Sequence, residues 1–275
     1  MLKTRIITAI VLAIVFLLAL FNTSGFTWSL IALSATLIGV WEWAKLIHLK
    51  KQATAIYIAL AFFIALIIEF SPASVISIYT DKVVFGLLGL SVLFWFIGAP
   101  LWLFTKKHIQ QKFPLAILGL ILLLSTWLAL KGLHSINPMF LLAILAVVWL
   151  ADSAAYFAGK AYGKHKLAPS ISPGKTWEGV AGAMLAVTIY GLCLCYYLHI
   201  SRWLIIGLWL VTALSIMGDL YESLLKRQAG VKDSSHLLPG HGGVLDRIDG
   251  LIPTLPVVLF CVYFPFFANL QLHAR

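Results

Sequence analysis

A glycine-rich, charged turn between Pro239 and Gly250 holds the residues best suited to chemistry. Glycines on both sides of His241 let the backbone approach a ligand closely and adopt positive φ. Asp246 and Asp249 follow at i, i+3 spacing, which places two carboxylates on one side of a helix start. Two carboxylates, completed by water and phosphate oxygens, are typical ligands of Mg²⁺. The turn therefore predicts a Mg²⁺ and phosphate site, although His241 would equally suit a structural hydrogen bond.

Cations accompany these carboxylates in the sequence. Arg247, between the two aspartates, can fork onto a phosphate. Upstream, Asp219, Glu222 or Ser223, and Lys226 follow i, i+3/i+4, i+7 spacing, so one helix face carries a carboxylate, a small polar group and a cation. Asp219 ends a long apolar stretch and is expected to face the protein interior, not lipid. The alternative is a simple ion-pair ladder along the helix.

A third polar stretch, 172–179, contains parts suited to an anion. Its Gly-Lys-Thr at 174–176 resembles a phosphate-binding P-loop, but Pro169 stands where that motif needs a glycine, so it is not one. Ser172 and Pro173 predict a helix start, whose free N–H groups favour phosphate, and Lys175 adds a positive charge. The alternative is a plain capped helix with a lysine that fixes membrane topology.

The fourth stretch begins at Asp152. Asp152 and Tyr156 are i and i+4 and share one helix face. An acid near the bilayer is costly unless it is paired, hydrated or bound to metal. The alternative is an interfacial aspartate paired with a nearby lysine, and this segment alone names no reaction.

The composition requires a membrane to hold these stretches. Hydrophobic residues make up 61% and charged residues 11%, with a mean hydropathy of +0.99, whereas soluble domains carry about a quarter charged residues. Alternating strand patterns are absent, so helices are the expected spanning elements. We predict an all-α polytopic membrane protein with about nine transmembrane helices. The expected spans are roughly Ile6–Phe21, Phe26–Trp43, Ala55–Phe70, Val83–Phe104, Pro114–Leu130, Pro138–Ala151, Gly179–Leu198, Trp203–Leu220 and Gly250–Asn269.

The net charge of +10 is first a topology signal. With the N-terminus inside, only Lys82, Lys131, Arg202 and Arg275 of the 20 Lys and Arg fall outside, which leaves 16 in the inner loops. This bias is typical of cytoplasmic loops, so no nucleic-acid partner is expected. The first apolar run resembles a signal peptide, but no clear cleavage site follows it, and we expect a retained helix.

The acidic residues divide the chain into two regions. Only Glu42, Glu69 and Asp81 precede Asp152. Residues 1–137 are therefore interpreted as a transmembrane scaffold of about five helices. Residues 138–275 are interpreted as a catalytic region of about four helices and two long inner loops, which are usual places for function. Those loops are Asp152–Glu178 and Tyr221–Asp249. The active site is expected at the cytoplasmic ends of the C-terminal helices.

The four stretches together indicate a reaction class. They supply carboxylates, cations and glycines, without a Ser-His-Asp or Cys-His nucleophile pattern. This inventory suits phosphoryl or nucleotidyl transfer, in which the protein mainly positions anionic groups and neutralises developing charge.

A longer pattern resembles a known family. It comprises Ser223-Leu224-Leu225-Lys226-Arg227, Lys232-Asp233, Ser235, Leu238-Pro239 and His241-Gly242-Gly243-Val244-Leu245-Asp246-Arg247-Ile248-Asp249. These residues resemble the complete signature of phosphatidate cytidylyltransferases (CDP-diacylglycerol synthases). The segments around Asp152, Ser172 and Asp219 are similar to the same family.

The resemblance implies a Mg²⁺-dependent reaction of CTP with phosphatidate and a homodimer. The charge bias predicts an inner-membrane protein with the site facing the cytoplasm. The resemblance leaves a second cation open. The implied roles are as follows. Mg²⁺ ligands are Asp219, Asp246 and Asp249; phosphate-binding cations are Lys226, Arg227, Lys232 and Arg247; further substrate-binding residues are Asp152, Tyr156, Ser172, Lys175, Thr176, Glu222, Ser223, Asp233, His241, Gly242 and Gly243.

Two rival functions remain. A CTP-dependent lipid (polyprenol) kinase would transfer the γ-phosphate to an alcohol and release CDP. An ion-coupled transporter would need charges near the bilayer midplane and repeat symmetry. The acids here lie near inner helix ends in one half of the chain, which favours the enzyme.

Overall fold

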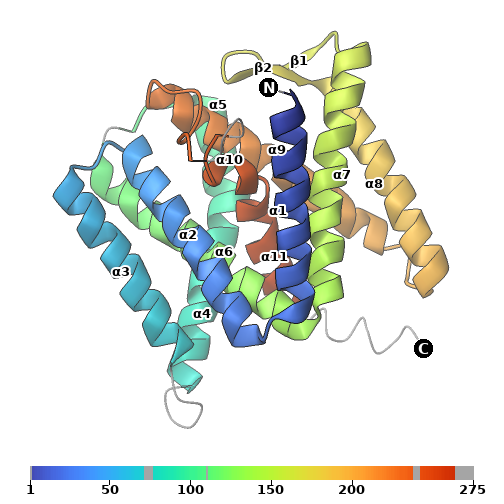
Figure 1. Ribbon diagram of the computed structural model, residues 1–275. Coiled ribbons are helices and arrows are strands. Elements are labelled where there is room, and N and C mark those ends of the chain that lie inside the picture. Colours follow the sequence, from blue (N-terminus) through green and yellow to red (C-terminus); the bar gives the residue numbers. More distant parts are fainter. Residues whose placement is uncertain (1, 71–76, 110, 238–241, 264–275) are drawn as a thin grey trace.

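The computed structural model describes residues 2–70, 77–109, 111–237 and 242–263, and it is a bundle of helices with one short hairpin (Figure 1). The helices are α1 (Leu2–Asn22), α2 (Gly25–Leu46), α3 (Lys51–Glu69), α4 (Ser77–Leu93), the π-helical turn η1 (Phe94–Gly98), α5 (Ala99–Thr105), α6 (Lys112–Ile136), α7 (Pro138–Tyr162), α8 (Trp177–Leu198), α9 (Leu204–Gln228), α10 (Leu245–Ile248) and α11 (Leu251–Tyr263). The strands are β1 (Lys166–Ala168) and β2 (Ser172–Thr176), which pair antiparallel.

The prediction of an all-helical polytopic membrane protein is confirmed. Within the described residues, seven helical stretches are long and apolar enough to cross a membrane, and two shorter apolar helices, Ala13–Asn22 and Leu251–Tyr263, accompany them. The expected span Val83–Phe104 is continued through η1, because a π-turn widens the helix without ending it. The end of the last expected span lies outside the described residues.

Two boundaries differ from the sequence analysis. The helix start predicted at Ser172 and Pro173 is wrong, since these residues lie in β2. Helix α8 begins after Thr176, whose backbone is extended and whose hydroxyl accepts a hydrogen bond from Gly179 N at 3.1 Å. Thr is a preferred N-cap residue, and a two-stranded hairpin tolerates the missing N–H of Pro173 at its edge.

The two long inner loops are also shorter than predicted. Helix α7 continues past Asp152 to Tyr162, and α9 continues past Tyr221 to Gln228. Good helix formers extend both helices beyond their apolar parts, until Gly163 in one case and Gly230, at φ +73°, in the other. The polar residues of both segments are therefore held on rigid helices.

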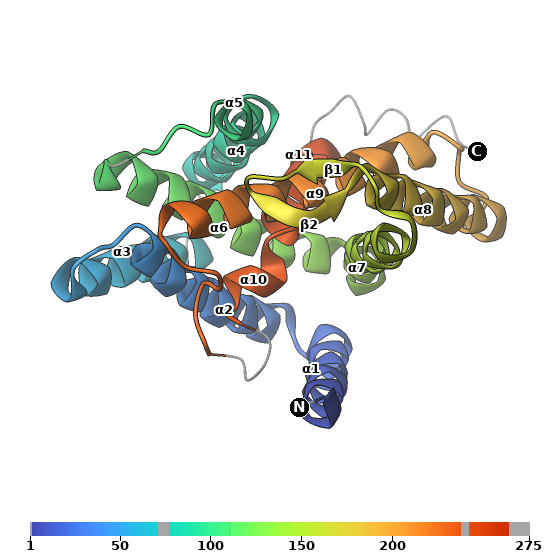
Figure 2. The ribbon, with the colours of Figure 1, turned by 90° about the horizontal axis from the view of Figure 1, so that it is seen from above.

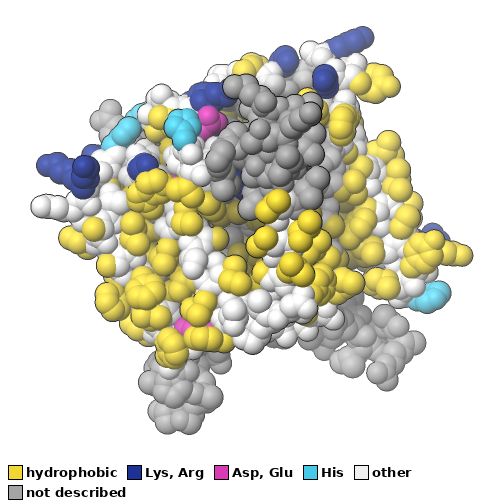
Figure 3. Space-filling model, in the orientation of Figure 1, with side chains coloured by type: hydrophobic (Ala, Val, Ile, Leu, Met, Phe, Trp, Pro, Cys, Tyr) yellow, Lys and Arg dark blue, Asp and Glu magenta, His cyan; other side chains and the backbone are white. Residues whose placement is uncertain are grey.

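The polar connections meet at one end of the bundle, which we call the site end. Lys112 Nζ donates to His48 O at 2.6 Å, Lys106 Nζ to Ser170 Oγ at 2.8 Å, and the side chain of Gln228 to a backbone carbonyl of the same α5–α6 connection at 3.2 Å. The hairpin and α10 lie at this end (Figure 1). Lys and Arg side chains border it, above a broad hydrophobic surface (Figure 3).

At the opposite end, a buried acid closes a separate polar contact. Glu69 Oε2 accepts from Ser29 Oγ at 2.9 Å and from Lys131 Nζ at 2.7 Å. Ser29 lies near the start of α2 and Glu69 at the end of α3. These two helices pack as consecutive antiparallel neighbours, so both residues lie away from the site end.

Seen from above, α9 runs through the centre of the site end, with the hairpin over it and α10 beside α2 (Figure 2). The Tyr221 ring on α9 packs against Trp43, Phe94, Trp95 and Trp102, with ring centroids 5.2–6.5 Å apart. These rings come from both regions of the chain, so residues 1–137 and 138–275 share one core. The division at residue 137 stays a prediction about function.

A close contact between α2 and α6 gives a test of this packing. A Cβ added at Gly119 would lie 2.3 Å from Trp43 Nε1, a buried atom that donates to Leu115 O at 2.9 Å. Gly119→Ala is expected to lower stability by about 1–3 kcal/mol. Gly207→Ala on α9 is the matched control, because its Cβ would meet nothing within 4 Å. Thermal unfolding in detergent compares them; equal melting temperatures would contradict this packing.

Candidate active site

Lys226 lies between two buried carboxylates at the site end. Its Nζ is 2.5 Å from Asp246 Oδ1 and 2.6 Å from Glu222 Oε2. The three side chains are only 12%, 6% and 5% exposed, for Lys226, Asp246 and Glu222. Helix spacing brings Glu222 to Lys226, as the sequence predicted, whereas Asp246 arrives from α10. We call these three residues the Lys226 cluster.

Asp246 has little acceptor capacity left. Its Oδ2 accepts from Ser234 N at 3.0 Å, Ser234 Oγ at 2.9 Å and Gly243 N at 2.8 Å. Gly242 must be glycine here, since its φ is +77° and a Cβ would lie 2.6 Å from Asp246 Oδ2. Burial alone would raise the pKa of Asp246, but hydrogen bonds from Lys226 and Gly243 hold it below its usual range.

A second group of charges surrounds Lys175 on β2. Lys175 Nζ is 2.6 Å from Asp219 Oδ2, and Ser223 Oγ donates to Asp219 Oδ1 at 3.2 Å. Asp152 and Asp249 interact electrostatically with both Lys175 and Asp219. The hairpin thus brings Lys175 to acids from α7, α9 and the α10–α11 junction. We call Lys175, Asp219, Asp152 and Asp249 the Lys175 cluster.

Close backbone packing brings Asp219 beside Asp249. A Cβ on Gly218 would lie 2.3 Å from Asp249 O and 2.8 Å from Pro253 Cγ, so only glycine allows α9 to approach this backbone. Burial raises the pKa of Asp249 to about 7, and the charge of Asp219 acts in the same direction. A partly buried pair of like charges, such as Asp219 and Asp249, is an environment that a bound cation would relieve.

Several predicted site residues lie farther out. Arg227, Lys232, Asp233 and Arg247 are exposed, and no ion pair found within the described residues includes them. Tyr156 is 61% exposed, and its ring faces Lys160, whose Nζ is 5.8 Å from the centroid.

Of the remaining predicted residues, Ser172 is half-buried in β2, and the buried Thr176 is committed to capping α8. His241 lies outside the described residues.

Sequence reasoning missed Glu42. This residue of α2 is fully buried, and it accepts hydrogen bonds from the segment 234–245. One signal was present, because an acid inside an apolar span is costly without partners. Glu42 lies in the region predicted to be a scaffold, and no spacing pattern connects it with residues 192 to 203 positions later.

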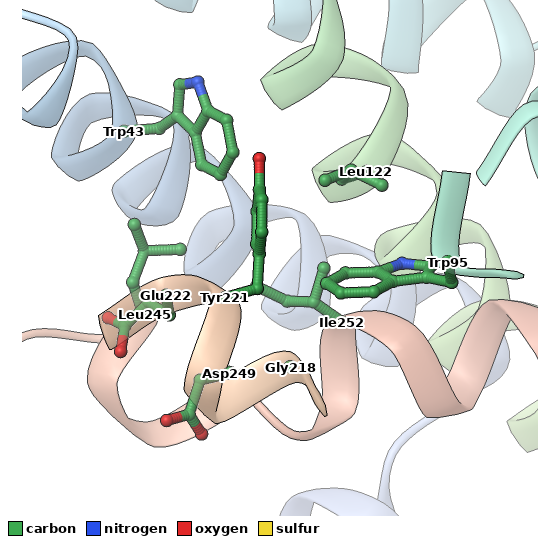
Figure 4. A pocket seen from close by; sticks show the side chains of 9 residues that line it. All are labelled: Trp43, Trp95, Leu122, Gly218, Tyr221, Glu222, Leu245, Asp249 and Ile252. Atoms are coloured by element: carbon green, nitrogen blue, oxygen red, sulfur yellow. The ribbon is translucent and has the colours of Figure 1, made fainter. Parts of the chain in front are cut away.

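A small cavity lies beside one carboxylate of each cluster, Glu222 and Asp249 (Figure 4). It is lined by Trp43, Trp95, Leu122, Gly218, Tyr221, Glu222, Leu245, Asp249 and Ile252, and its volume is about 10 Å³. That volume admits roughly one water molecule, so the cavity is not a substrate pocket. The Tyr221 hydroxyl points toward Trp43 and away from the carboxylates of Glu222 and Asp249 (Figure 4).

Mg²⁺ takes carboxylate, phosphate and water oxygens as ligands in near-octahedral geometry. Within the described part of the chain, no group of three or more His, Cys, Asp or Glu residues could hold a metal ion. Asp219 and Asp249 nevertheless fit a Mg²⁺ that takes its other ligands from phosphate and water. Asp246 stays a predicted Mg²⁺ ligand, but it would have to give up its ion pair with Lys226 to bind the metal.

Comparison with known proteins decides the family. The model of the cytidylyltransferase family matches residues 3–265. The chain belongs to the cytidylyltransferase family. Two similar proteins named phosphatidate cytidylyltransferase are those of Haemophilus influenzae, 35% identical over 97% of this chain and 99% of that protein, and Pseudomonas aeruginosa, 38% identical over 94% and 95%. A Staphylococcus aureus protein of the same name is 45% identical over 46% of this chain and 48% of its own length.

The Lys226 cluster of this cytidylyltransferase gives a stability prediction. Lys226→Met leaves two buried carboxylates without their cation, which is expected to cost about 3–5 kcal/mol. Arg227→Met is the matched control, since the neighbouring cation is exposed and its loss is expected to leave stability within about 0.5 kcal/mol. Denaturant unfolding in detergent measures both. A Lys226→Met protein as stable as the control would show that the cluster does not hold the bundle together.

Proposed function

We propose that the chain transfers the cytidylyl group of CTP to phosphatidate and forms CDP-diacylglycerol and diphosphate. The observation that carries this proposal is the similarity, over nearly the whole of both chains, to two proteins named for that activity. The charged clusters at one end of an apolar bundle support it, because a lipid phosphate and a nucleotide triphosphate can both reach a site at a helix end.

The chemistry needs charge neutralisation more than proton transfer. A phosphate oxygen of phosphatidate attacks the α-phosphorus of CTP; the new P–O bond forms as the bond to the β-phosphate oxygen breaks, and diphosphate leaves. The attacking oxygen is already anionic, so no strong general base is required. The main cost is bringing two highly charged groups together, which fixed cations offset.

The cations of this chain divide that work. Lys175, whose side chain is 23% exposed, is more open than Lys226 and is the cluster residue best placed to contact a phosphate. The exposed Arg227, Lys232 and Arg247 bind the triphosphate and the lipid phosphate in our proposal. Lys226 holds Asp246 and Glu222 in place. Asp219 and Asp249 would hold Mg²⁺, which neutralises triphosphate charge when bound.

In this proposal the protein lies in the inner membrane, and its site end faces the cytoplasm. The support is the distribution of positive charge. Of the 20 Lys and Arg in the chain, 4 are assigned outside, and the other 16 fall in loops predicted to be inside. CTP is a cytoplasmic metabolite, so this orientation gives the enzyme access to its nucleotide. The homodimer implied by the family resemblance stays a prediction.

The products of the reaction test the proposal against its nearest rival. Purified protein in detergent, with phosphatidate, CTP labelled in the cytosine ring and Mg²⁺, is expected to form labelled CDP-diacylglycerol and diphosphate in equal amounts. A lipid kinase would instead release labelled CDP and leave the lipid unlabelled. A transporter would form neither product. Thin-layer chromatography with a diphosphate assay separates these outcomes, and absence of labelled lipid would overturn the proposal.

A further inference from the structure

Glu42 is a buried carboxylate that receives four hydrogen bonds from the signature region. Its Oε1 accepts from Ser235 Oγ at 2.6 Å and Val244 N at 3.0 Å. Its Oε2 accepts from Ser234 Oγ at 3.2 Å and Leu245 N at 2.7 Å. Glu42 thus joins α2 to both ends of the segment that carries Asp246, although about two hundred positions separate them in the chain.

Glu42 packs closely against the backbone of the turn at Gly243. A Cβ on Gly243 would lie 2.3 Å from Glu42 Oε1 and 2.1 Å from Ser234 Oγ. Glycine at position 243 therefore permits the carboxylate to reach the turn. No ion pair found within the described residues includes Glu42, so N–H and O–H donors stabilise its charge.

Ser234 connects Glu42 to the Lys226 cluster. Its hydroxyl lies 3.2 Å from Glu42 Oε2 and 2.9 Å from Asp246 Oδ2, so its single proton is shared between two carboxylates. Asp246 in turn holds Lys226 at 2.5 Å. The side-chain route from Glu42 to Asp246 is therefore this one hydroxyl group.

A purely structural role does not explain this residue well. An apolar side chain would pack α2 against the turn without the cost of desolvating a charge. Resting on the proposed cytidylyl transfer, we infer that Glu42 is a positioning residue for the reaction, which fixes the Asp246–Lys226 pair through Ser234. The N-terminal region thereby contributes to the active site and is more than a membrane scaffold.

The test compares two buried acids on the α2–α3 pair. Glu42→Gln keeps the shape of the side chain but turns an NH₂ group toward the N–H and O–H donors around it. Glu69→Gln makes the same change at the opposite end of the bundle, where Glu69 contacts Ser29. Ser29 and Glu42 are separated by about 20 Å along α2. Glu42→Gln is expected to lower kcat at saturating CTP and phosphatidate at least tenfold, with a melting temperature within about 4 °C of wild type. Glu69→Gln is expected to keep kcat within twofold.

A double-mutant cycle with Ser234→Ala tests the route. If Glu42 acts through Ser234, the double variant Glu42→Gln/Ser234→Ala loses no more kcat than the worse single variant. Losses that multiply would overturn the route, and a stable Glu42→Gln protein with wild-type kcat would overturn the inference. If Glu42→Gln does not fold, Ser234→Ala alone decides, because wild-type kcat in that variant would equally refute it.

Failure of the proposed function would look different. If the wild-type chain forms no CDP-lipid, the proposed reaction is refuted. Limited trypsin digestion then tests whether Glu42 fixes the segment around Asp246. Cleavage at the exposed Lys232 and Arg247 is expected to be at least fivefold faster in Glu42→Gln than in Glu69→Gln. Equal cleavage rates would show that Glu42 does not fix this segment.

Discussion

The site depends on the position of Lys226 between Asp246 and Glu222. Its ammonium group lies 2.5 Å and 2.6 Å from the two carboxylates, in a bundle with a broad hydrophobic surface below the site end (Figure 3). Buried charges are tolerated only when each has partners, so the contact fixes the turn before α11 against α9. The same constraint explains the donors around Asp246, since every oxygen of that carboxylate is used.

The two clusters differ in how far they are exposed to solvent. The side chains of the Lys226 cluster are at most 12% exposed, although Glu222 Oε1 accepts no hydrogen bond, whereas Asp219 and Lys175 are 34% and 23% exposed and have the acids Asp152 and Asp249 nearby. The first arrangement suits support, and the second suits a changing set of anionic ligands. In the proposed function, the Lys175 cluster contacts substrate together with the exposed Arg227, Lys232 and Arg247, and the Lys226 cluster with Glu42 has a positioning role.

Much of this arrangement could be predicted from local patterns. The apolar runs indicated the helices, and the i, i+4 spacing of Glu222 and Lys226 placed both on one face. Thr176 was missed as the helix cap because Ser172 and Pro173 also suit a helix start. The contacts of Glu42 with Ser234 could not be found from the sequence, because they join residues 192 positions apart and leave no periodic trace. Tertiary packing, not propensity, determines such contacts.

The position of a bound metal ion tests the division of labour most directly. Crystals of the wild-type protein grown with CTP and Mn²⁺ in place of Mg²⁺ would locate the ion by its anomalous scattering. The account predicts a peak ligated by Asp219 and Asp249, with Lys226 still paired to Asp246. A peak at Asp246 with Lys226 displaced, and none at Asp219 or Asp249, would contradict it.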